Sequence, residues 1–165
     1  MDPSSSFEHQ LGILLPRLRR FAHALSRDAA DADDLTQATL ERALRSKAQW
    51  QPGTRLDSWT YRIMRNLWID TARARSRRAD REAPEGEGAA IGEDPRGAMD
   101  AAIDLKRIMA AMARLPDEQR EIVALILVEG FGYREVSEML DLPMGTVSSR
   151  LVRGRTALLA MVGER

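Results

Sequence analysis

YREVSEMLDLPMGTVSSRLVRGR, residues 133–155, is the stretch that decides the fold, because it predicts a helix, a tight turn and a second helix. In the first helix, Val136, Met139 and Leu140 recur at helical spacing, so one side of this helix is apolar. Pro143 then interrupts the pattern, and its fixed φ and missing N–H suit the first turn of the second helix. We therefore expect a helix-turn-helix unit.

The second helix of this unit has an apolar side and a polar, basic side. Its apolar residues are expected to face a core: Val147, Leu151, Leu158 and Leu159. The other side carries Thr146, Ser149, Arg150 and Arg153. No acidic residue occurs between Met144 and Val162, so nothing on this helix would repel phosphate. The pattern is typical of a helix that enters the major groove of DNA, although an ordinary helical hairpin with a solvated face would share it.

The composition favours a protein built from small, mostly helical units. The chain has 165 residues, of which 44% are hydrophobic and 30% charged, which suits one domain or two small ones. It has no cysteine, which excludes disulfides and thiolate metal sites and fits a reducing cytoplasm. No apolar run is long enough for a membrane span, and the first ten residues lack the apolar core of a signal peptide. We therefore expect a cytoplasmic protein without membrane insertion.

The net charge is zero, but acidic and basic residues are segregated along the chain. Residues 55–81 contain eight Arg and three Asp, whereas residues 82–100 contain six acidic residues and one Arg. Such asymmetry indicates localised binding surfaces rather than a uniformly neutral surface.

The N-terminal part predicts two helices separated by a turn at residues 26–30. The first spans residues 7–25 with an apolar stripe, and Pro16 inside it should cause a kink or a break. The second spans residues 31–44, with acidic residues in its first turn, where they complement the helix dipole. Its expected core-facing residues are Leu35, Thr39, Leu40, Ala43 and Leu44. The other side carries Asp34, Gln37 and Glu41, and by pattern alone it is a solvated face.

A polar loop at residues 45–53 and a third helix at residues 56–78 follow. Trp50 in the loop either folds back onto the core or waits for a partner, and the sequence leaves both open. The expected inward stripe of the helix is Leu56, Trp59, Ile63 and Leu67. Trp68 lies about half a turn away from Trp59 around the helix, so one of the two tryptophans should pack against another helix or a partner.

The third helix also carries basic residues among its aromatic ones. The residues expected on one outward face, near Tyr61, are Arg62, Arg65, Asn66 and Arg73. Cations for phosphates and rings for stacked bases are what single-stranded nucleic-acid binding requires, although an arginine-rich solvated helix would show the same pattern.

Residues 79–98 lack helical periodicity and are rich in Pro and Gly, which predicts a flexible linker. Beyond it, a helix at residues 99–115 and a helix that begins at Pro116 precede the helix-turn-helix. Their expected core-facing residues are Ile103, Ile108, Met109, Met112, Ile122, Val123, Leu125, Ile126 and Val128. The predicted fold is therefore all-α, with two small helical domains, residues 1–78 and 99–165, joined by the linker.

Several of these segments together resemble one protein family. DADDLTQATLERAL (residues 31–44) and RLDSWTYRIMRNLWIDTARAR (residues 55–75) resemble region two of the bacterial sigma factors of the extracytoplasmic-function group, in the sigma-70 superfamily. LPDEQREIVALILVEGFGYREVSEMLDLPMGTVSSRLVRGR (residues 115–155) is similar to their region four. The resemblance implies a three-helix region-two domain and a four-helix region-four domain. It also implies a transcription initiation factor that needs no cofactor and is not an enzyme.

The same resemblance implies the partners and the residues that contact them. The partners would be core RNA polymerase, through the clamp helices of its beta-prime subunit, promoter DNA, and an anti-sigma factor that restrains the protein until a stress signal arrives. Residues that match the polymerase-binding surface are Asp31, Asp34, Leu35, Gln37 and Glu41. Residues that match the surface for the minus-ten promoter element are Lys47, Trp50, Gln51, Thr54, Arg62, Arg65 and Asn66. Residues that match the reader of the minus-thirty-five element are Thr146, Ser148, Ser149, Arg150 and Arg153.

Two positions depart from the family pattern. The family usually has Glu where this chain has Ala38, and a basic residue where it has Ser148. The first departure should weaken one polymerase contact. The second should remove one phosphate contact in the minus-thirty-five reader.

Two other classes of protein are compatible with parts of the sequence. A stand-alone helix-turn-helix repressor or activator would explain the C-terminal half but not the helix rich in arginine and tryptophan. An enzyme is the weaker alternative, because His9 and His23 would stand about 21 Å apart on one helix and cannot share a metal. The sequence also has no nucleophile elbow, phosphate-binding loop or zinc pattern. We expect no catalytic and no metal-binding residue.

Overall fold

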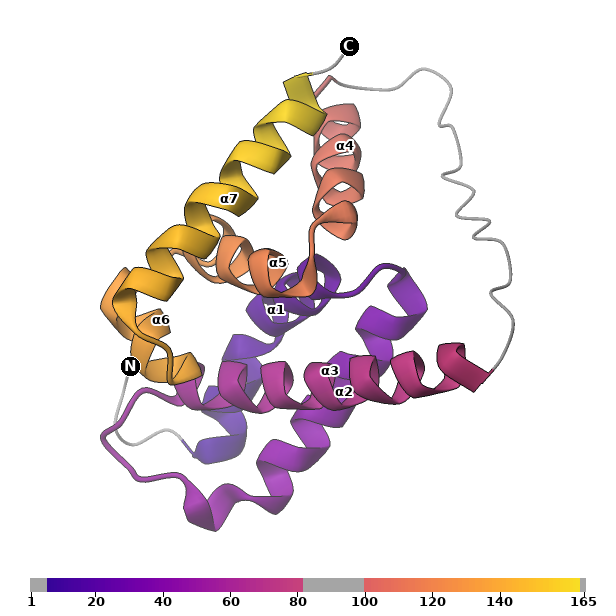
Figure 1. Cartoon of the computed structure of the whole chain (residues 1–165). Coiled ribbons are helices and arrows are strands. Elements are labelled where there is room, and N and C mark those ends of the chain that lie inside the picture. Colours follow the sequence, from indigo (N-terminus) through magenta and orange to yellow (C-terminus); the bar gives the residue numbers. More distant parts are fainter. Residues whose placement is uncertain (1–5, 82–99, 164–165) are drawn as a thin grey trace.

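A computed structural model of the chain describes residues 6–81 and 100–163, and every regular element in these ranges is helical (Figure 1). The N-terminal half contains α1 (Phe7–Leu25), α2 (Ala29–Arg45), the short 3₁₀ turn η1 (Lys47–Gln49) and α3 (Leu56–Arg81). The C-terminal half contains α4 (Asp100–Arg114), α5 (Asp117–Val123), the π-helical turn η2 (Ala124–Val128), α6 (Tyr133–Leu140) and α7 (Met144–Gly163). The predicted all-α fold of two helical halves is confirmed. Residues 82–98 of the predicted linker lie outside the described residues.

The N-terminal half begins with two capped helices. The Ser6 hydroxyl accepts a hydrogen bond from the His9 N–H at the start of α1, and the Asp28 carboxylate accepts one from the Asp31 N–H at the start of α2. Pro16 does not break α1, contrary to one of the two expected outcomes. The carbonyl that its missing N–H leaves free belongs to the exposed Gly12, where water can bond it.

The core-facing side of α3 was predicted wrongly in part. The residues of α3 that are buried are Leu56, Thr60, Tyr61, Met64 and Trp68, whereas Trp59, Ile63 and Leu67 are only partly buried. The prediction assumed that α3 has a single core-facing side. In the structure, α3 packs on α1 and α2 on one side and on the C-terminal half on the other. In α2, Leu44 is 48% exposed, so the prediction that it faces the core is wrong.

Three predicted core residues of the C-terminal half are exposed. Ile108 is 37% exposed because only the last turns of α4, with Ala111 and Met112, are enclosed. Val128 is 38% exposed at the end of the π-helical turn. Leu159 is 60% exposed, since it lies about 100° around α7 from Leu158, which packs against the core.

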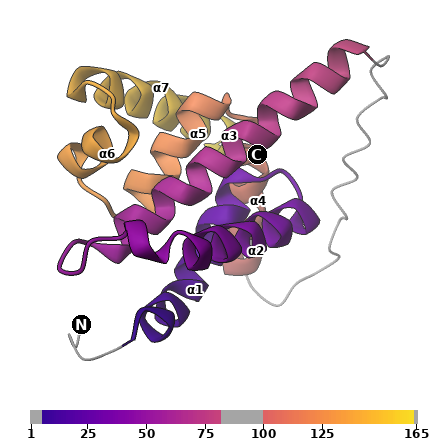
Figure 2. The same ribbon diagram turned by 90° about the horizontal axis from the view of Figure 1, so that it is seen from below.

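The two halves pack against each other in the described part of the chain. Figures 1 and 2 show α5 and α6 lying against α1 and α3. The buried side chains of both halves form one continuous hydrophobic cluster. None of the described helices has the length and apolar character that a bilayer crossing requires.

Candidate nucleic-acid interface

The helix-turn-helix has the predicted geometry. Asp141 ends α6 in the left-handed conformation, at φ 54°, and so turns the chain toward α7. The Pro143 carbonyl accepts hydrogen bonds from Thr146 and Val147, at 3.0 and 3.1 Å, which starts α7 at the proline as expected. Val147 and Leu151 are buried, so the polar side of the helix is presented outward.

Four of the predicted DNA-reading residues lie on one side of α7, and one does not. The four are Thr146, Ser149, Arg150 and Arg153. Ser148 is exposed, but about 200° separates it from Thr146 around the helix, so it projects from a different side. The Arg150 guanidinium lies 3.8 Å from the Glu118 carboxylate, which is 72% exposed. The Arg150 side chain is 22% exposed, but a pair of this length with an exposed partner is weak, so Arg150 can exchange Glu118 for a phosphate or a base.

Gly154 fixes the distance between α7 and α5. A Cβ atom at this position would stand 2.8 Å from Cγ2 of Val123 and 3.2 Å from Cβ of Gln119. Only glycine permits this close approach, and the approach holds the outward side of α7 rigidly with respect to the rest of the half.

The outer face of α2 is available as predicted. Asp34, Gln37 and Glu41 are all exposed, and their spacing places them on one side of the helix. Leu35 does not belong to this surface, because it is only 8% exposed. The Asp31 carboxylate is paired with the Arg75 guanidinium of α3 at 2.5 Å.

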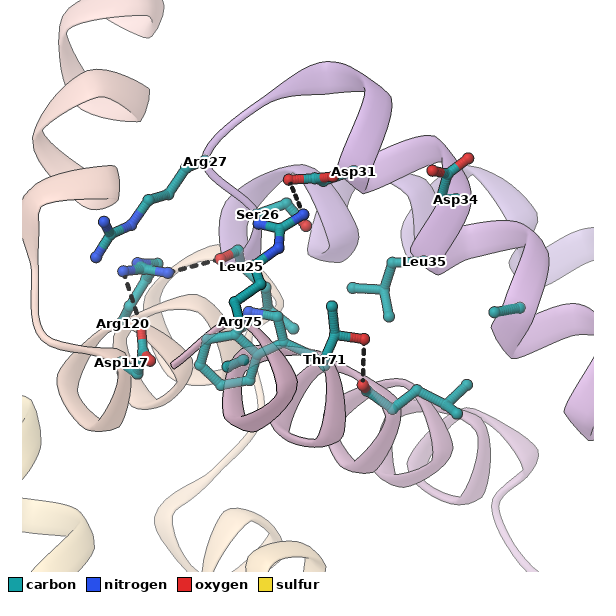
Figure 3. A pocket seen from close by; sticks show the side chains of 14 residues that line it. Leu25, Ser26, Arg27, Asp31, Asp34, Leu35, Thr71, Arg75, Asp117 and Arg120 are labelled. Atoms are coloured by element: carbon teal, nitrogen blue, oxygen red, sulfur yellow. Dashed lines mark hydrogen bonds and ion pairs between the residues drawn. The ribbon is translucent and has the colours of Figure 1, made fainter. Parts of the chain in front are cut away.

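A groove of about 460 Å³ lies between α2, α3 and the start of α5 (Figure 3). Its floor is apolar, formed by residues that include Leu35, Ala38 and Trp68, and its rim carries Asp34 and the Asp31–Arg75 pair. Of the residues predicted to bind polymerase, Asp31, Asp34 and Leu35 therefore line this groove, whereas the exposed Gln37 and Glu41 are not part of its lining.

The loop after α2 folds back onto the protein. The Trp50 ring lies 5.6 Å from the Phe7 ring, which decides between the two alternatives left by the sequence. The Trp50 indole N–H is buried without a hydrogen-bond partner, so this position is not fully satisfied. Lys47 is paired with the Glu8 carboxylate at 2.7 Å. Gln51 and Thr54, the other predicted residues of this loop, are exposed.

The basic side of α3 does not face solvent throughout. Arg62 donates hydrogen bonds to the carbonyls of Met139 and Glu138, at 3.0 and 2.9 Å, and Arg65 is paired with Glu121 at 2.9 Å. All three acceptors belong to the C-terminal half, so the expected outward face is partly covered at Arg65, whose side chain is 22% exposed, whereas Arg62 stays exposed while it makes these bonds. Asn66, next to them, is exposed.

Two titratable groups at this boundary are strongly affected by burial. Burial raises the pKa of Tyr61, and so does the hydrogen bond from its hydroxyl to Glu129. The pattern had suggested that the Tyr61 ring could stack on a base. The ring is fully buried and therefore cannot do so in this structure. Burial also raises the pKa of Glu121, even though the hydrogen bond from Arg65 opposes this shift. The Arg65–Glu121 pair is therefore held at a desolvation cost.

Sequence reasoning missed the residues that join the two halves. They are Arg17, Arg20, Arg120, Glu129 and Phe131. Arg20 and Glu129 are 109 positions apart, and no local pattern can pair residues across such a distance.

Comparison with known proteins identifies the family of both halves. The family model described as Sigma-70 region 2 matches residues 13–78, and the model described as Sigma-70, region 4 matches residues 105–158. The chain is 35% identical over 162 residues to the ECF RNA polymerase sigma factor EcfG of Rhodopseudomonas palustris, covering 98% of this chain and 88% of the relative. It is 39% identical over 145 residues to the ECF sigma factor SigE of Mycolicibacterium smegmatis, covering 86% of this chain and 56% of that relative.

Solved structures agree on the architecture. The sigma factor RpoE, in its complex with the anti-sigma factor NepR from Bartonella quintana, has a TM-score of 0.82 and 31% identity, covering 96% of this chain and 98% of that one. CnrH, solved in complex with the cytosolic domain of CnrY, has a TM-score of 0.67 at 20% identity, covering 98% of this chain and 92% of that one. At that identity the second likeness shows the fold alone.

Proposed function

This chain belongs to the extracytoplasmic-function group of the sigma-70 RNA polymerase sigma factors, and from this premise we propose how its residues start transcription. It is a transcription initiation factor that binds core RNA polymerase and promoter DNA. Residues 1–78 form the domain that recognises and helps to melt the minus-ten element, and residues 99–165 form the domain that reads the minus-thirty-five element, with residues 79–98 as the linker. We propose that an anti-sigma factor restrains it, since the similar sigma factor RpoE was solved in complex with the anti-sigma factor NepR.

The observation that carries this proposal is that two different surfaces occur in the order that the family requires. An exposed acidic face on α2 and basic residues on α3 fall within the region-two match. A helix-turn-helix whose second helix has no acidic residue falls within the region-four match. Acidic groups suit a basic protein partner, whereas an acid-free helix suits phosphate, so the two surfaces fit polymerase and duplex DNA respectively.

We assign no catalytic step to this chain. The polymerase carries out the chemistry of RNA synthesis, and the chain supplies binding and positioning. It would act in the cytoplasm, where polymerase and chromosomal DNA are found.

Run-off transcription tests the proposal. The purified chain is mixed with core RNA polymerase and a pool of genomic promoter fragments, and the RNA products are sequenced. We expect transcripts that start at a common promoter motif and that need the chain. A stand-alone repressor or activator would instead bind paired DNA half-sites without polymerase and start no transcription with core enzyme.

Asp34→Lys should weaken binding of the chain to core polymerase about tenfold, because it places a like charge against a basic partner surface. Asp34 is exposed, so the helix should remain folded. Binding is measured by fluorescence anisotropy with labelled chain. Asp70→Lys makes the same charge change on the exposed side of α3 and serves as the control. Equal affinities for the two variants would remove α2 from the polymerase interface.

Arg150→Ala should cost on the order of 1–3 kcal/mol of promoter binding by the polymerase complex if Arg150 contacts a base edge with two hydrogen bonds. The loss should be confined to promoters that carry the preferred base at one minus-thirty-five position. Arg155→Ala, an exposed arginine on the opposite side of α7, is the control. A uniform loss over all upstream sequences would show that Arg150 contacts phosphate instead.

A further inference from the structure

We infer that Phe7 is a positioning residue for the loop that reads the minus-ten element: its ring holds Trp50 and so fixes where the exposed turn at residues 51–54 meets a base. This inference rests on the proposed function, because it assumes that this loop contacts promoter DNA. Phe7 precedes the stretch that the Sigma-70 region 2 model matches, which begins at residue 13. Its role is therefore argued from its own contacts.

The exposed turn at residues 51–54 has an internally fixed shape. The Gln51 carbonyl accepts a hydrogen bond from the Thr54 N–H at 3.1 Å and another from the Thr54 hydroxyl at 2.6 Å. Pro52 at the second position and Gly53 at the third, with φ 90°, suit a type II β-turn. All four residues are exposed. The turn therefore presents Gln51 and Thr54 in a defined geometry, provided that its two ends are fixed.

The two ends of the turn are anchored differently. On the C-terminal side, Leu56 is 2% exposed at the first residue of α3, so a core helix fixes that end. On the N-terminal side, Trp50 follows the 3₁₀ turn η1 and is partly buried. Among the described residues, its buried indole N–H has no hydrogen-bond partner. The Trp50 side chain has no other polar atom, so packing alone determines its place.

Phe7 supplies this packing. Its ring is 6% exposed and lies 5.6 Å from the Trp50 ring at an interplanar angle of 52°. It also meets the Trp59 ring of α3 edge-on, at 6.0 Å and 75°. Aromatic pairs favour offset and edge-on arrangements at these distances, so one ring joins the loop to α3. Phe7 is itself held in place, because it begins α1 directly after the N-cap Ser6, whose hydroxyl accepts from the His9 N–H.

A second contact between α1 and the loop is weaker. The Lys47 ammonium lies 2.7 Å from the Glu8 carboxylate and 5.8 Å from the centre of the Phe7 ring. The side chains of Lys47 and Glu8 are 51% and 53% exposed, and such exposed ion pairs contribute little to stability. Lys47 can therefore exchange Glu8 for a DNA phosphate while Phe7 keeps the loop in place.

The test measures base discrimination rather than total activity. A chain that is merely less stable loses transcription from all promoters in the same proportion, whereas a displaced turn changes the preference for a base. The promoter motif is taken from run-off transcription by the wild-type chain with core RNA polymerase. Each minus-ten position is then changed to the other three bases, and the ratio of transcript from the preferred base to transcript from the others is measured.

We expect Phe7→Ala to lower this ratio about fivefold at one or two adjacent minus-ten positions, because a displacement of about 1 Å is enough to spoil a precise contact. Phe7→Leu keeps an apolar side chain but removes the ring, so it should lower the ratio about twofold. Phe7→Leu also carries the test if Phe7→Ala does not fold. Circular dichroism shows that each variant is folded at the temperature of the assay.

Two control variants separate the ring from other effects. Leu18→Ala removes a side chain without exposed surface from the same helix, 11 positions from Phe7, which is about 16 Å along α1. It should lower stability and leave the ratio unchanged. Glu8→Gln breaks the ion pair with Lys47 but keeps the Phe7 ring, and it too should leave the ratio unchanged.

A ratio that both Phe7 variants leave unchanged, or that Leu18→Ala or Glu8→Gln lowers as much as they do, would overturn the inference. So would a wild-type chain that starts transcription without any base preference in the minus-ten element. The proposed function fails by a different result, which is that the wild-type chain starts no transcription with core polymerase on any promoter.

Discussion

Replacing Arg120 with alanine is expected to lower the free energy of unfolding by about 3–5 kcal/mol, because it removes one member of a buried charged network. The Arg120 side chain is 2% exposed and donates to the carbonyls of Met112, Leu115 and Leu25, at 3.0, 2.9 and 2.7 Å, and to the Asp117 carboxylate at 3.0 Å. Without it, three carbonyls at the ends of α4 and α1 lose their partner. Each buried acceptor left without a hydrogen bond costs about 1–3 kcal/mol. Urea unfolding followed by circular dichroism measures the change.

Arg114→Ala is the matched control for this prediction. Arg114 is exposed at the end of α4, so its removal should change the free energy of unfolding by less than about 0.5 kcal/mol. The loss of unfolding free energy for Arg120→Lys should fall between the losses for Arg120→Ala and Arg114→Ala. An ammonium group carries the charge but lacks the planar guanidinium geometry that reaches several carbonyls at once. A loss of less than about 1 kcal/mol of unfolding free energy for Arg120→Ala would mean that water replaces the guanidinium between the two halves.

Local patterns predicted the helices because each signal acts over a few residues. Pro143 begins α7, and the spacing of Val136, Met139 and Leu140 gave the buried side of α6 correctly. The exposed set of Asp34, Gln37 and Glu41 on α2 follows from the same spacing. Where a helix buries one contiguous side, as α2 and α6 do, the apolar stripe is a sufficient guide to its orientation.

The same patterns failed on α3, which is buried against the other N-terminal helices on one side and against the C-terminal half on another. On α3, Tyr61 and Trp68 were assigned to the outside or left open, yet both are buried, and Trp68 lies under the Arg120 guanidinium at 5.9 Å. The expectation that one of the two tryptophans packs against another helix is confirmed by this contact. Helix α5 carried no such signal: five of its seven residues, DEQREIV, are polar or charged, so nothing in the pattern marked Arg120 and Glu121 as buried. The identity of their partners could not follow from any spacing.

Phe21→Ala is expected to lower the free energy of unfolding by about 3–5 kcal/mol, as is usual when a large aromatic side chain is removed from a core. Phe21 has no exposed surface and supports the Tyr61 ring at 4.8 Å. Removing it leaves a cavity under Tyr61, the residue that donates to Glu129 at 2.7 Å. Ile13→Ala, on the same helix but 56% exposed, should cost well under about 1 kcal/mol and is the control.

The effect of Phe21→Ala should also depend on Glu129. Tyr61 touches both Phe21 and Glu129, so the stability changes of Phe21→Ala and Glu129→Gln should not add, and the double variant should lose less than the sum. The coupling arises because a Tyr61 ring that has lost its support no longer holds its hydroxyl in place for the carboxylate. Ile13→Ala combined with Glu129→Gln should be additive. Additivity in both cycles would mean that Tyr61 keeps its position beside Glu129 without support from Phe21.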